Sequence, residues 1–151
     1  MPSKSLRPLW RCPKCGERFV TRKMWHSCKK RSLKALFARS EPQVFQMFKK
    51  FAKTMRAYGP VRVIAQKTRV VFQERVRFAA CMPRKSYLLC ALALPQRYNH
   101  PRFLEITTYP PRFHGHYFRV DSVKDLDPQV QRWMRKAYTV GEQRHLQKRL
   151  R

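Results

Sequence analysis

Three cysteines and one histidine near the start of the chain have the spacing of a metal site. Cys12 and Cys15 are separated by two residues, and His26 and Cys28 follow as an H-x-C pair. Zn2+ takes four tetrahedral Cys or His ligands, and a C-x2-C pair supplies half of that shell from one tight turn. The sequence therefore predicts one structural zinc ion held by these four residues.

The residues around the four ligands also fit a small zinc-binding lobe. Gly16 follows the second cysteine, where we expect the turn to need a positive φ. Trp10, Phe19 and Trp25 lie beside or between the ligand pairs and supply apolar surface to cover the ion. The close H-x-C pair favours a zinc knuckle or ribbon over a DNA-reading finger, whose second pair is wider. Accidental spacing with free, reduced thiols is the alternative, but the coincidence of ligands, glycine and aromatics favours zinc.

The chain carries a large excess of positive charge. It has 35 Lys and Arg against 8 Asp and Glu, for a formal net charge of +27. A compact domain with this excess repels itself and gains from binding phosphates, because each contact releases condensed counterions. An ordinary solvated basic surface is the alternative. The first forty residues hold twelve Lys or Arg and a single acid, Glu17, so the predicted zinc lobe is the most cationic third.

These charges predict a nucleic-acid partner, and we favour RNA over DNA. No recognition helix is evident, and recognition of RNA by its shape and phosphates needs none. A large structured RNA such as ribosomal RNA is the expected partner. A DNA-binding or protein-docking adaptor with a merely structural zinc lobe is the alternative. The candidate contacts are basic residues and one aromatic that could stack on a base. They are Lys14, Arg18, Arg22, Lys23, Lys29, Lys30, Arg31, Lys34, Arg97, Tyr98, Arg144, Lys148, Arg149 and Arg151.

A second candidate site contains His114 and His116. At strand spacing both side chains point to the same face. With His100, Lys67, Arg69 or Tyr109 beside them, they could act as general acid and base in a metal-independent ribonuclease of toxin or defence type. The favoured alternative is a polar strand face whose imidazoles contact phosphate or backbone. The acidic residues are too sparse for a metal-dependent nuclease, which needs two or three carboxylates around Mg2+.

Hydrophobic periodicity predicts helices at both ends of the remaining chain. A short helix is expected over residues 32–38. A longer one begins at the capping box Ser40–Gln43 and ends at Gly59. The last helix starts at Asp127 as its N-cap and ends at Gly141. Apolar residues at three- and four-residue steps give each long helix one buried face.

Between the helices the hydrophobic period changes to two, which predicts strands. These strands are expected over residues 61–66, 69–82, 87–94, 103–109 and 114–120. Glu74 breaks the alternation and is expected to mark a bulge or bend. The nearly all-apolar run 87–94 should be the central strand. Cys81 and Cys90 fall within strands and are expected to be buried structural thiols.

The order of helix, strands and helix predicts an α+β fold. Short connections favour an antiparallel, meander-like sheet of about five strands. We expect a basic zinc knuckle or ribbon at 1–31, an α+β domain at 32–141 and a basic C-terminal extension at 142–151. No apolar run has the length of a membrane span, and no signal-peptide core is evident. A cytoplasmic location follows, where thiols stay reduced and able to bind metal.

Short motifs are spread over nearly the whole chain. They are Trp10-x-Cys12-Pro13-x-Cys15-Gly16, Phe19, His26-Ser27-Cys28, Lys67-Thr68-Arg69, His100-Pro101-Arg102, and Trp133…Ala137-Tyr138 with Gly141-Glu142-Gln143. Together they resemble a bacterial family catalogued as a domain of unknown function, number 5655. The resemblance implies a zinc knuckle followed by an α+β domain, and it implies no activity.

Overall fold

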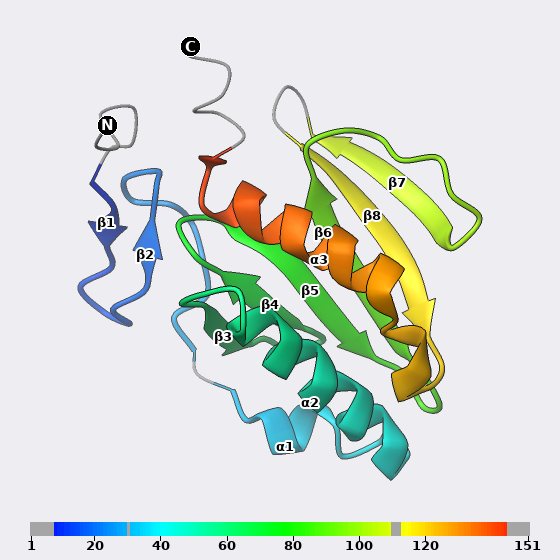
Figure 1. Ribbon diagram of the computed structural model, residues 1–151. Helices are drawn as coiled ribbons and strands as arrows, with labels where there is room; N and C mark the ends of the chain where they lie inside the picture. Colours follow the sequence, from blue (N-terminus) through cyan, green and yellow to red (C-terminus); the bar gives the residue numbers. More distant parts are fainter. Residues whose placement is uncertain (1–7, 30, 110–112, 145–151) are drawn as a thin grey trace.

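Two amphipathic helices packed on an antiparallel sheet form the body of the protein (Figure 1). The computed structural model describes residues 8–29, 31–109 and 113–144. A two-stranded hairpin near the N-terminus precedes this body. The predicted α+β class, with helix, strands and helix in that order, is confirmed. Among the described residues, no helix is long and apolar enough to cross a membrane.

The main sheet has six strands in the order β3-β4-β5-β6-β8-β7, and every neighbouring pair is antiparallel. The strands are β3 (Arg62–Ala65), β4 (Val70–Gln73), β5 (Arg77–Pro83), β6 (Leu88–Leu94), β7 (Phe103–Tyr109) and β8 (Phe113–Val120). β6 lies inside the sheet, between β5 and β8, as its apolar sequence predicts. β3 and β7 form the two edges.

The sheet differs from the expected five-stranded meander in two ways. Residues 69–82 form two strands, because the chain reverses at Glu74 and Gln73 pairs with Arg77. The register also shifts between Phe72 and Gln73, next to the expected irregularity. The second difference is that β7 lies at the edge and β8 returns between β6 and β7. Hydrophobic alternation locates strands but carries no information on which strands pair.

The turn after β4 is held by the end of the last helix. The backbone N–H groups of Arg75 and Val76 both donate to the carbonyl oxygen of Gly141, at 2.9 and 3.1 Å. The ideal position of a Cβ on Gly141 would lie 2.3 Å from the ring of Phe78, so only glycine fits this close approach without rearrangement.

The helices are α1 (Leu33–Leu36), α2 (Pro42–Arg56) and α3 (Pro128–Gly141), and a 3-10 turn, η1 (Val123–Asp125), precedes α3. The expected Ser40 cap of α2 is wrong, because the N-cap is Glu41 and no side chain caps it. The Ser40 hydroxyl instead donates to the carbonyl of Arg84 at 2.7 Å. The predicted cap of α3 is present: Asp127 accepts from the N–H of Val130 at 3.0 Å.

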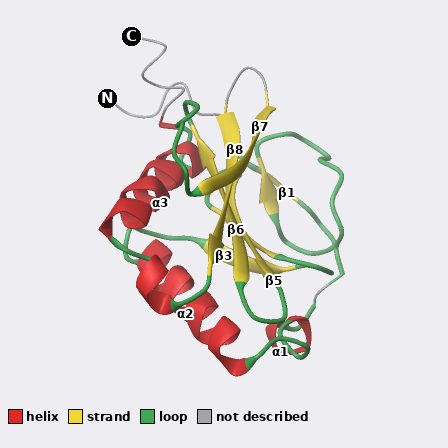
Figure 2. Ribbon diagram, turned by 90° about the vertical axis from the view of Figure 1, so that its right-hand side faces the viewer, coloured by secondary structure: helices red, strands yellow, loops and turns green. Residues whose placement is uncertain are grey.

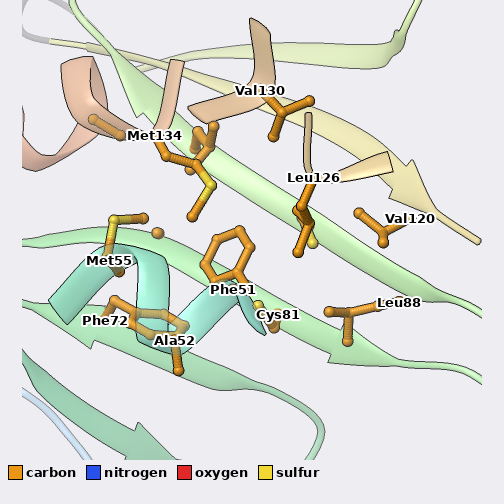
Figure 3. Close-up of a cluster of buried hydrophobic side chains, with 14 of the residues drawn as sticks. Phe51, Ala52, Met55, Phe72, Cys81, Leu88, Val120, Leu126, Val130 and Met134 are labelled. Atoms are coloured by element: carbon orange, nitrogen blue, oxygen red, sulfur yellow. The ribbon is translucent and has the colours of Figure 1, made fainter. Parts of the chain in front are cut away.

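The core lies between the two long helices and one face of the sheet (Figure 3). Phe51 and Met55 of α2 and Met134 of α3 are fully buried, and the ring of Phe51 lies 5.1 Å from that of Phe72 of β4. Cys81 of β5 and Cys90 of β6 lie opposite each other on neighbouring strands, and both thiols are free and fully buried. Their expected role as structural thiols agrees with this burial.

Candidate metal centre and basic lobe

The residues before α1 form a small lobe built on the hairpin of β1 (Trp10–Arg11) and β2 (Arg18–Phe19). The turn between these strands is closed by two backbone hydrogen bonds. The N–H of Gly16 donates to the backbone carbonyl of Cys12 at 2.9 Å, and the N–H of Cys12 donates to the backbone carbonyl of Glu17 at 2.8 Å. Gly16 has a φ of +78°, as its position after the second cysteine predicts. We refer to residues 8–32 as the basic lobe.

The four predicted ligands converge at one end of this turn. Their ligand atoms all lie within 4.8 Å of one another. The sulfurs of Cys12 and Cys28 are 3.8 Å apart, and Nε2 of His26 is 3.2 Å from the sulfur of Cys15 and 3.4 Å from that of Cys28. A tetrahedral zinc ion with bonds of about 2.3 Å to sulfur and about 2.0 Å to nitrogen spaces its ligand atoms by about 3.5–3.8 Å. The cluster has the dimensions of such a site.

His26 presents the correct nitrogen to the cluster. Its Nδ1 lies 2.7 Å from the carbonyl oxygen of Met24. A carbonyl only accepts hydrogen bonds, so Nδ1 carries the proton and the lone pair of Nε2 faces the sulfurs. The imidazole ring packs 4.5 Å from Phe19 and 6.3 Å from Trp10, centroid to centroid. These two aromatic rings fix the orientation of the ligand.

The ionisation of the thiols also suits a bound cation. Backbone N–H groups of Cys15 and Lys14 help lower the pKa of the Cys12 thiol to about 6, so a thiolate forms readily there. Burial and the neighbouring thiols raise the pKa of Cys28 to about 11. Three adjacent thiolates are stabilised when a divalent cation neutralises them. Cys12, Cys15, His26 and Cys28 thus form a group that can hold a metal ion, and four protein ligands suit a structural zinc.

Trp25 does not cover the cluster, contrary to the expectation from sequence. Its side chain is 88% exposed, whereas Phe19 is buried. His26 points inward to the sulfurs, and its neighbour in this non-helical segment points outward to solvent. Met24 is also exposed. The apolar cover therefore comes from Trp10 and Phe19, and Trp25 is left as a large indole on the surface.

The lobe is attached to the sheet by polar contacts. Gln73 of β4 is buried and its amide donates to the backbone carbonyl of Arg18. Arg77 of β5 donates to Gln73 at 3.2 Å and lies 5.5 Å from the ring of Phe19. Arg62 of β3 pairs with Glu17. Three strands of the body thus hold the lobe.

A groove lies between the lobe and the edge strand β3. It has a volume of about 420 Å³ and is lined by Cys15, Cys28, Lys29, Arg31 and Arg62 among others. A second hollow of about 230 Å³ shares Lys29 and Arg31 and extends to Lys67. The two hollows adjoin each other at Lys29 and Arg31, and the first lies beside the candidate metal centre.

Most of the predicted RNA contacts that the structure describes lie on the lobe or in α1 directly after it. Those that are described there, or in α1 directly after it, are all exposed. They are Lys14, Arg18, Arg22, Lys23, Lys29, Arg31 and Lys34. Lys30, Lys148, Arg149 and Arg151 lie outside the described residues. The described cations lie on the segments that carry the four ligands or directly follow them, so their positions depend on the fold of the lobe.

The remaining predicted contacts lie elsewhere. Arg97 and Tyr98 are in the loop between β6 and β7, and Arg97 donates to Thr108 at 3.3 Å. Tyr98 is half-buried. Arg144 lies just after α3 and pairs with Glu142 at 3.1 Å. None of these three residues belongs to the lobe or to α1.

Sequence reasoning did not include two groups of residues that the structure exposes. One is Trp25, which the ligand spacing had assigned to the interior of the lobe. The other is a set of cations on the outer faces of the two long helices, which helical periodicity alone describes as a solvated face. They are Lys49, Lys50, Lys53, Arg56, Arg132, Arg135 and Lys136. The sequence does carry one indication of this set of cations, because no acidic residue lies between residues 42 and 56 or between 128 and 141.

His114 and His116 lie on β8 but have different environments. His116 has 0% exposure, and its Nε2 accepts from the N–H of Tyr98 at 3.0 Å. Its Nδ1 therefore donates to the carbonyl of His114, 2.8 Å away. Burial lowers the pKa of His116, which favours this neutral form. With both nitrogens engaged, His116 has none free for proton transfer to a substrate. His114 is partly exposed, with Nδ1 3.0 Å from the hydroxyl of Thr108.

The assignment of the metal centre predicts which cysteine substitutions remove the metal. We expect the protein to contain about one zinc per chain, measured by elemental analysis. Cys28→Ser should lower this content strongly, because it removes one of four ligands. Cys81→Ala should leave it unchanged, because that thiol lies in the core. Equal zinc contents in the two variants would contradict the assignment.

His116 predicts a pH dependence of stability. The folded-state pKa lies below the ordinary value of 6.5. As the pH falls through that value, the unfolded chain takes up a proton that the folded chain does not, so the free energy of unfolding decreases. His116→Gln removes this contribution. The stability advantage of wild type over the variant, from urea denaturation, should therefore shrink between about pH 7.5 and about pH 5.5. A constant or growing advantage would contradict the prediction.

Comparison with known proteins places the body of the chain in a family. The model of the family described as Domain of unknown function (DUF5655) matches residues 33–141, from α1 to the end of α3. The Cys/His cluster precedes the matched segment. No curated protein and no solved structure matches the chain. Because the family match covers more than half of the 151 residues, the chain belongs to this family of domains of unknown function.

Proposed function

We propose that this is a zinc-stabilised RNA-binding protein whose basic lobe binds the phosphates of structured RNA, such as ribosomal RNA. The observation that supports this most directly is the set of exposed cations around the Cys/His cluster, with the exposed Trp25 among them. Cations supply affinity for a phosphate backbone, and an exposed aromatic supplies a stacking surface for an unpaired base.

The only acid of the lobe is used internally. Glu17 pairs with Arg62 on the body, and the carboxylate side chain is only 14% exposed. The outward charge of the lobe is therefore entirely positive. Such a surface attracts a polyanion over a distance comparable to the Debye length, about 8 Å at physiological salt.

The cations would be held in place before RNA arrives. Lys29 follows the last ligand directly, and Arg31 is two residues further on. A bound metal fixes the chain up to Cys28, and Gln73 fixes the lobe on the sheet. A preorganised contact loses less conformational entropy on binding than a cation on a free tail.

Trp25 favours RNA with unpaired bases. It projects from the same segment as Arg22 and Lys23, which are exposed. Tyr98, the stacking residue suggested by the sequence, is half-buried and its ring lies 5.8 Å from His116. Trp25 is therefore the better placed of the two to stack on a base that is not paired.

RNA is favoured over DNA by the backbone of the lobe. His26 and Cys28 lie on a segment with no helix, and the described residues 8–32 contain none. A zinc finger that reads DNA places a helix in the major groove. Sequence-specific RNA recognition instead uses loops and bulges, whose bases can be splayed out and stacked.

The phosphate contacts predict a change in salt dependence. The double variant Lys29→Ala/Arg31→Ala should bind a structured RNA more weakly. The slope of log affinity against log salt should become shallower by about 1.4–1.8, because each lost phosphate contact removes about 0.7–0.9. Fluorescence anisotropy at several salt concentrations measures both quantities.

The matched control removes the same charge elsewhere. Arg84 and Lys85 are exposed in the turn between β5 and β6. Arg84→Ala/Lys85→Ala should leave the slope nearly unchanged. Equal effects of the two double variants would show that only net charge matters, which would contradict a binding surface on the lobe.

Trp25 predicts a preference for unpaired bases. Trp25→Ala should weaken binding to a hairpin RNA with an open loop by about 1–3 kcal/mol, the value of one base stacked on an aromatic side chain. Trp25→Phe should retain most of the affinity. Binding to a perfect RNA duplex, measured by the same anisotropy titration, should change little. A loss of similar size on both RNAs would assign Trp25 to the fold of the lobe instead.

A further inference from the structure

The outer faces of α2 and α3 form a second strongly basic surface. Its cations come from both helices, and none of residues 42–56 or 128–141 is acidic. We call this set the helix surface. It comprises Lys49, Lys50, Lys53 and Arg56 of α2 with Arg132, Arg135 and Lys136 of α3, all exposed except the half-buried Lys50. Solvated surfaces of ordinary proteins intersperse both signs of charge, and this one does not.

Within the described chain, no carboxylate forms an ion pair with these cations. Lys50 donates to the carbonyl of Val123 at 3.0 Å. Lys49 lies 5.7 Å from the ring of Phe45, and Arg135 lies 5.8 Å from that of Tyr58. The ion pairs of Arg62, Arg102, Arg119 and Arg144 all lie outside the helix surface. The charge of the helix surface therefore stays available to an external anion.

The two helices leave a groove between them. It has a volume of about 690 Å³ and is lined by Lys49, Lys50 and Lys53 on one side and Gln131 on the other, with Tyr58 at its end. Protein interfaces are depleted in lysine and are anchored by buried aromatic and arginine side chains. Three lysines in an open groove are better suited to a phosphate backbone, which they can neutralise from several positions.

The helix surface and the basic lobe lie on opposite faces of the sheet. Phe72 points to the helices, with its ring 6.2 Å from Phe48 and 5.1 Å from Phe51. Successive strand residues point to opposite faces, so Gln73 points away from the helices, and it is Gln73 that binds the lobe at Arg18. Figure 2 shows α2 and α3 on one side of the sheet and β1 on the other.

This separation limits what one RNA segment can reach. A helix layer packed on a sheet is about 20 Å thick, since each layer is about 10 Å. A straight duplex in contact with the lobe would have the whole body between itself and the helix surface. Two basic surfaces that face away from each other suit two separate segments.

We propose that the helix surface is a second RNA-binding site and that one molecule of the protein bridges two RNA segments. This inference rests on the proposed function of the lobe, because bridging requires the lobe to bind the first segment. The groove between α2 and α3 then binds the phosphate backbone of the second. In a large folded RNA the two segments can belong to one molecule, which the protein would hold together.

A two-step capture experiment tests the proposal. One hairpin RNA is immobilised and saturated with protein, free protein is washed away, and a second, fluorescent RNA is added. The wild type should retain the second RNA. Lys49→Gln/Lys53→Gln should reduce this retention by about fivefold or more, through lost phosphate contacts, while binding to the immobilised RNA stays within about twofold. Arg84→Gln/Lys85→Gln is the charge-matched control and should retain the second RNA as the wild type does.

The outcomes separate the two proposals. If the wild type does not bind the immobilised RNA, the proposed function fails. If it binds that RNA but does not retain the second, or if the helix variant retains it fully, bridging through the helix surface is overturned while RNA binding stands. Circular dichroism of the variants confirms that each is folded. Retention of an acidic protein but not of the second RNA would assign the helix surface to a protein partner and overturn the proposal.

Discussion

The mutual repulsion of positive charges is the constraint under which this structure forms. A net charge of +27 on 151 residues opposes any compact state, and the repulsion grows as the chain contracts. The fold offsets it with an apolar core between two helices and a sheet, and no Lys or Arg among the described residues is buried. Cations that cannot be neutralised inside must lie on the surface. A polyanion that binds the folded state and not the unfolded chain would stabilise the protein by mass action.

The few acidic residues are placed where they organise the chain. Glu17 joins the lobe to β3 through Arg62. Asp127 caps α3 and accepts from Arg102 at 2.8 Å, so the N–H of Val130 and this guanidinium lower the pKa of the carboxyl group. Asp125 accepts from the N–H groups of Asp121 and Ser122 at the start of η1. Because these acidic residues stabilise the fold, they do not neutralise the positive charge of the outer surface.

The sequence alone predicted the features that depend on a few residues close together in the chain. The spacing of Cys12, Cys15, His26 and Cys28 predicted a cluster that the structure forms. Gly16 and the Asp127 cap were likewise predicted, because a tight turn and a helix start depend on a few adjacent residues.

Where distant parts of the chain decide the outcome, the sequence was misleading or silent. Ser40 does not cap α2: Glu41 occupies the N-cap position, and the Ser40 hydroxyl donates to the carbonyl oxygen of Arg84, far along the chain. The outward position of Trp25 follows from the inward position of His26, which only the assembled cluster fixes. The pairing of β8 between β6 and β7 and the opposite placement of the two basic surfaces are properties of topology. The helix cations looked ordinary in sequence because their groove exists only when both helices pack side by side.

The contact between Gly141 and the turn after β4 gives the last turn of α3 a structural influence beyond its own helix. Its carbonyl holds Arg75 and Val76, and the strand entering that turn ends at Gln73, the residue that binds the lobe. Helix ends are among the first parts of a protein to open locally. Fraying of α3 would therefore loosen the turn after β4, and with it the strand end at Gln73 that supports the lobe. Rigidity at the C-terminal end of the helix sets how firmly the N-terminal lobe is held.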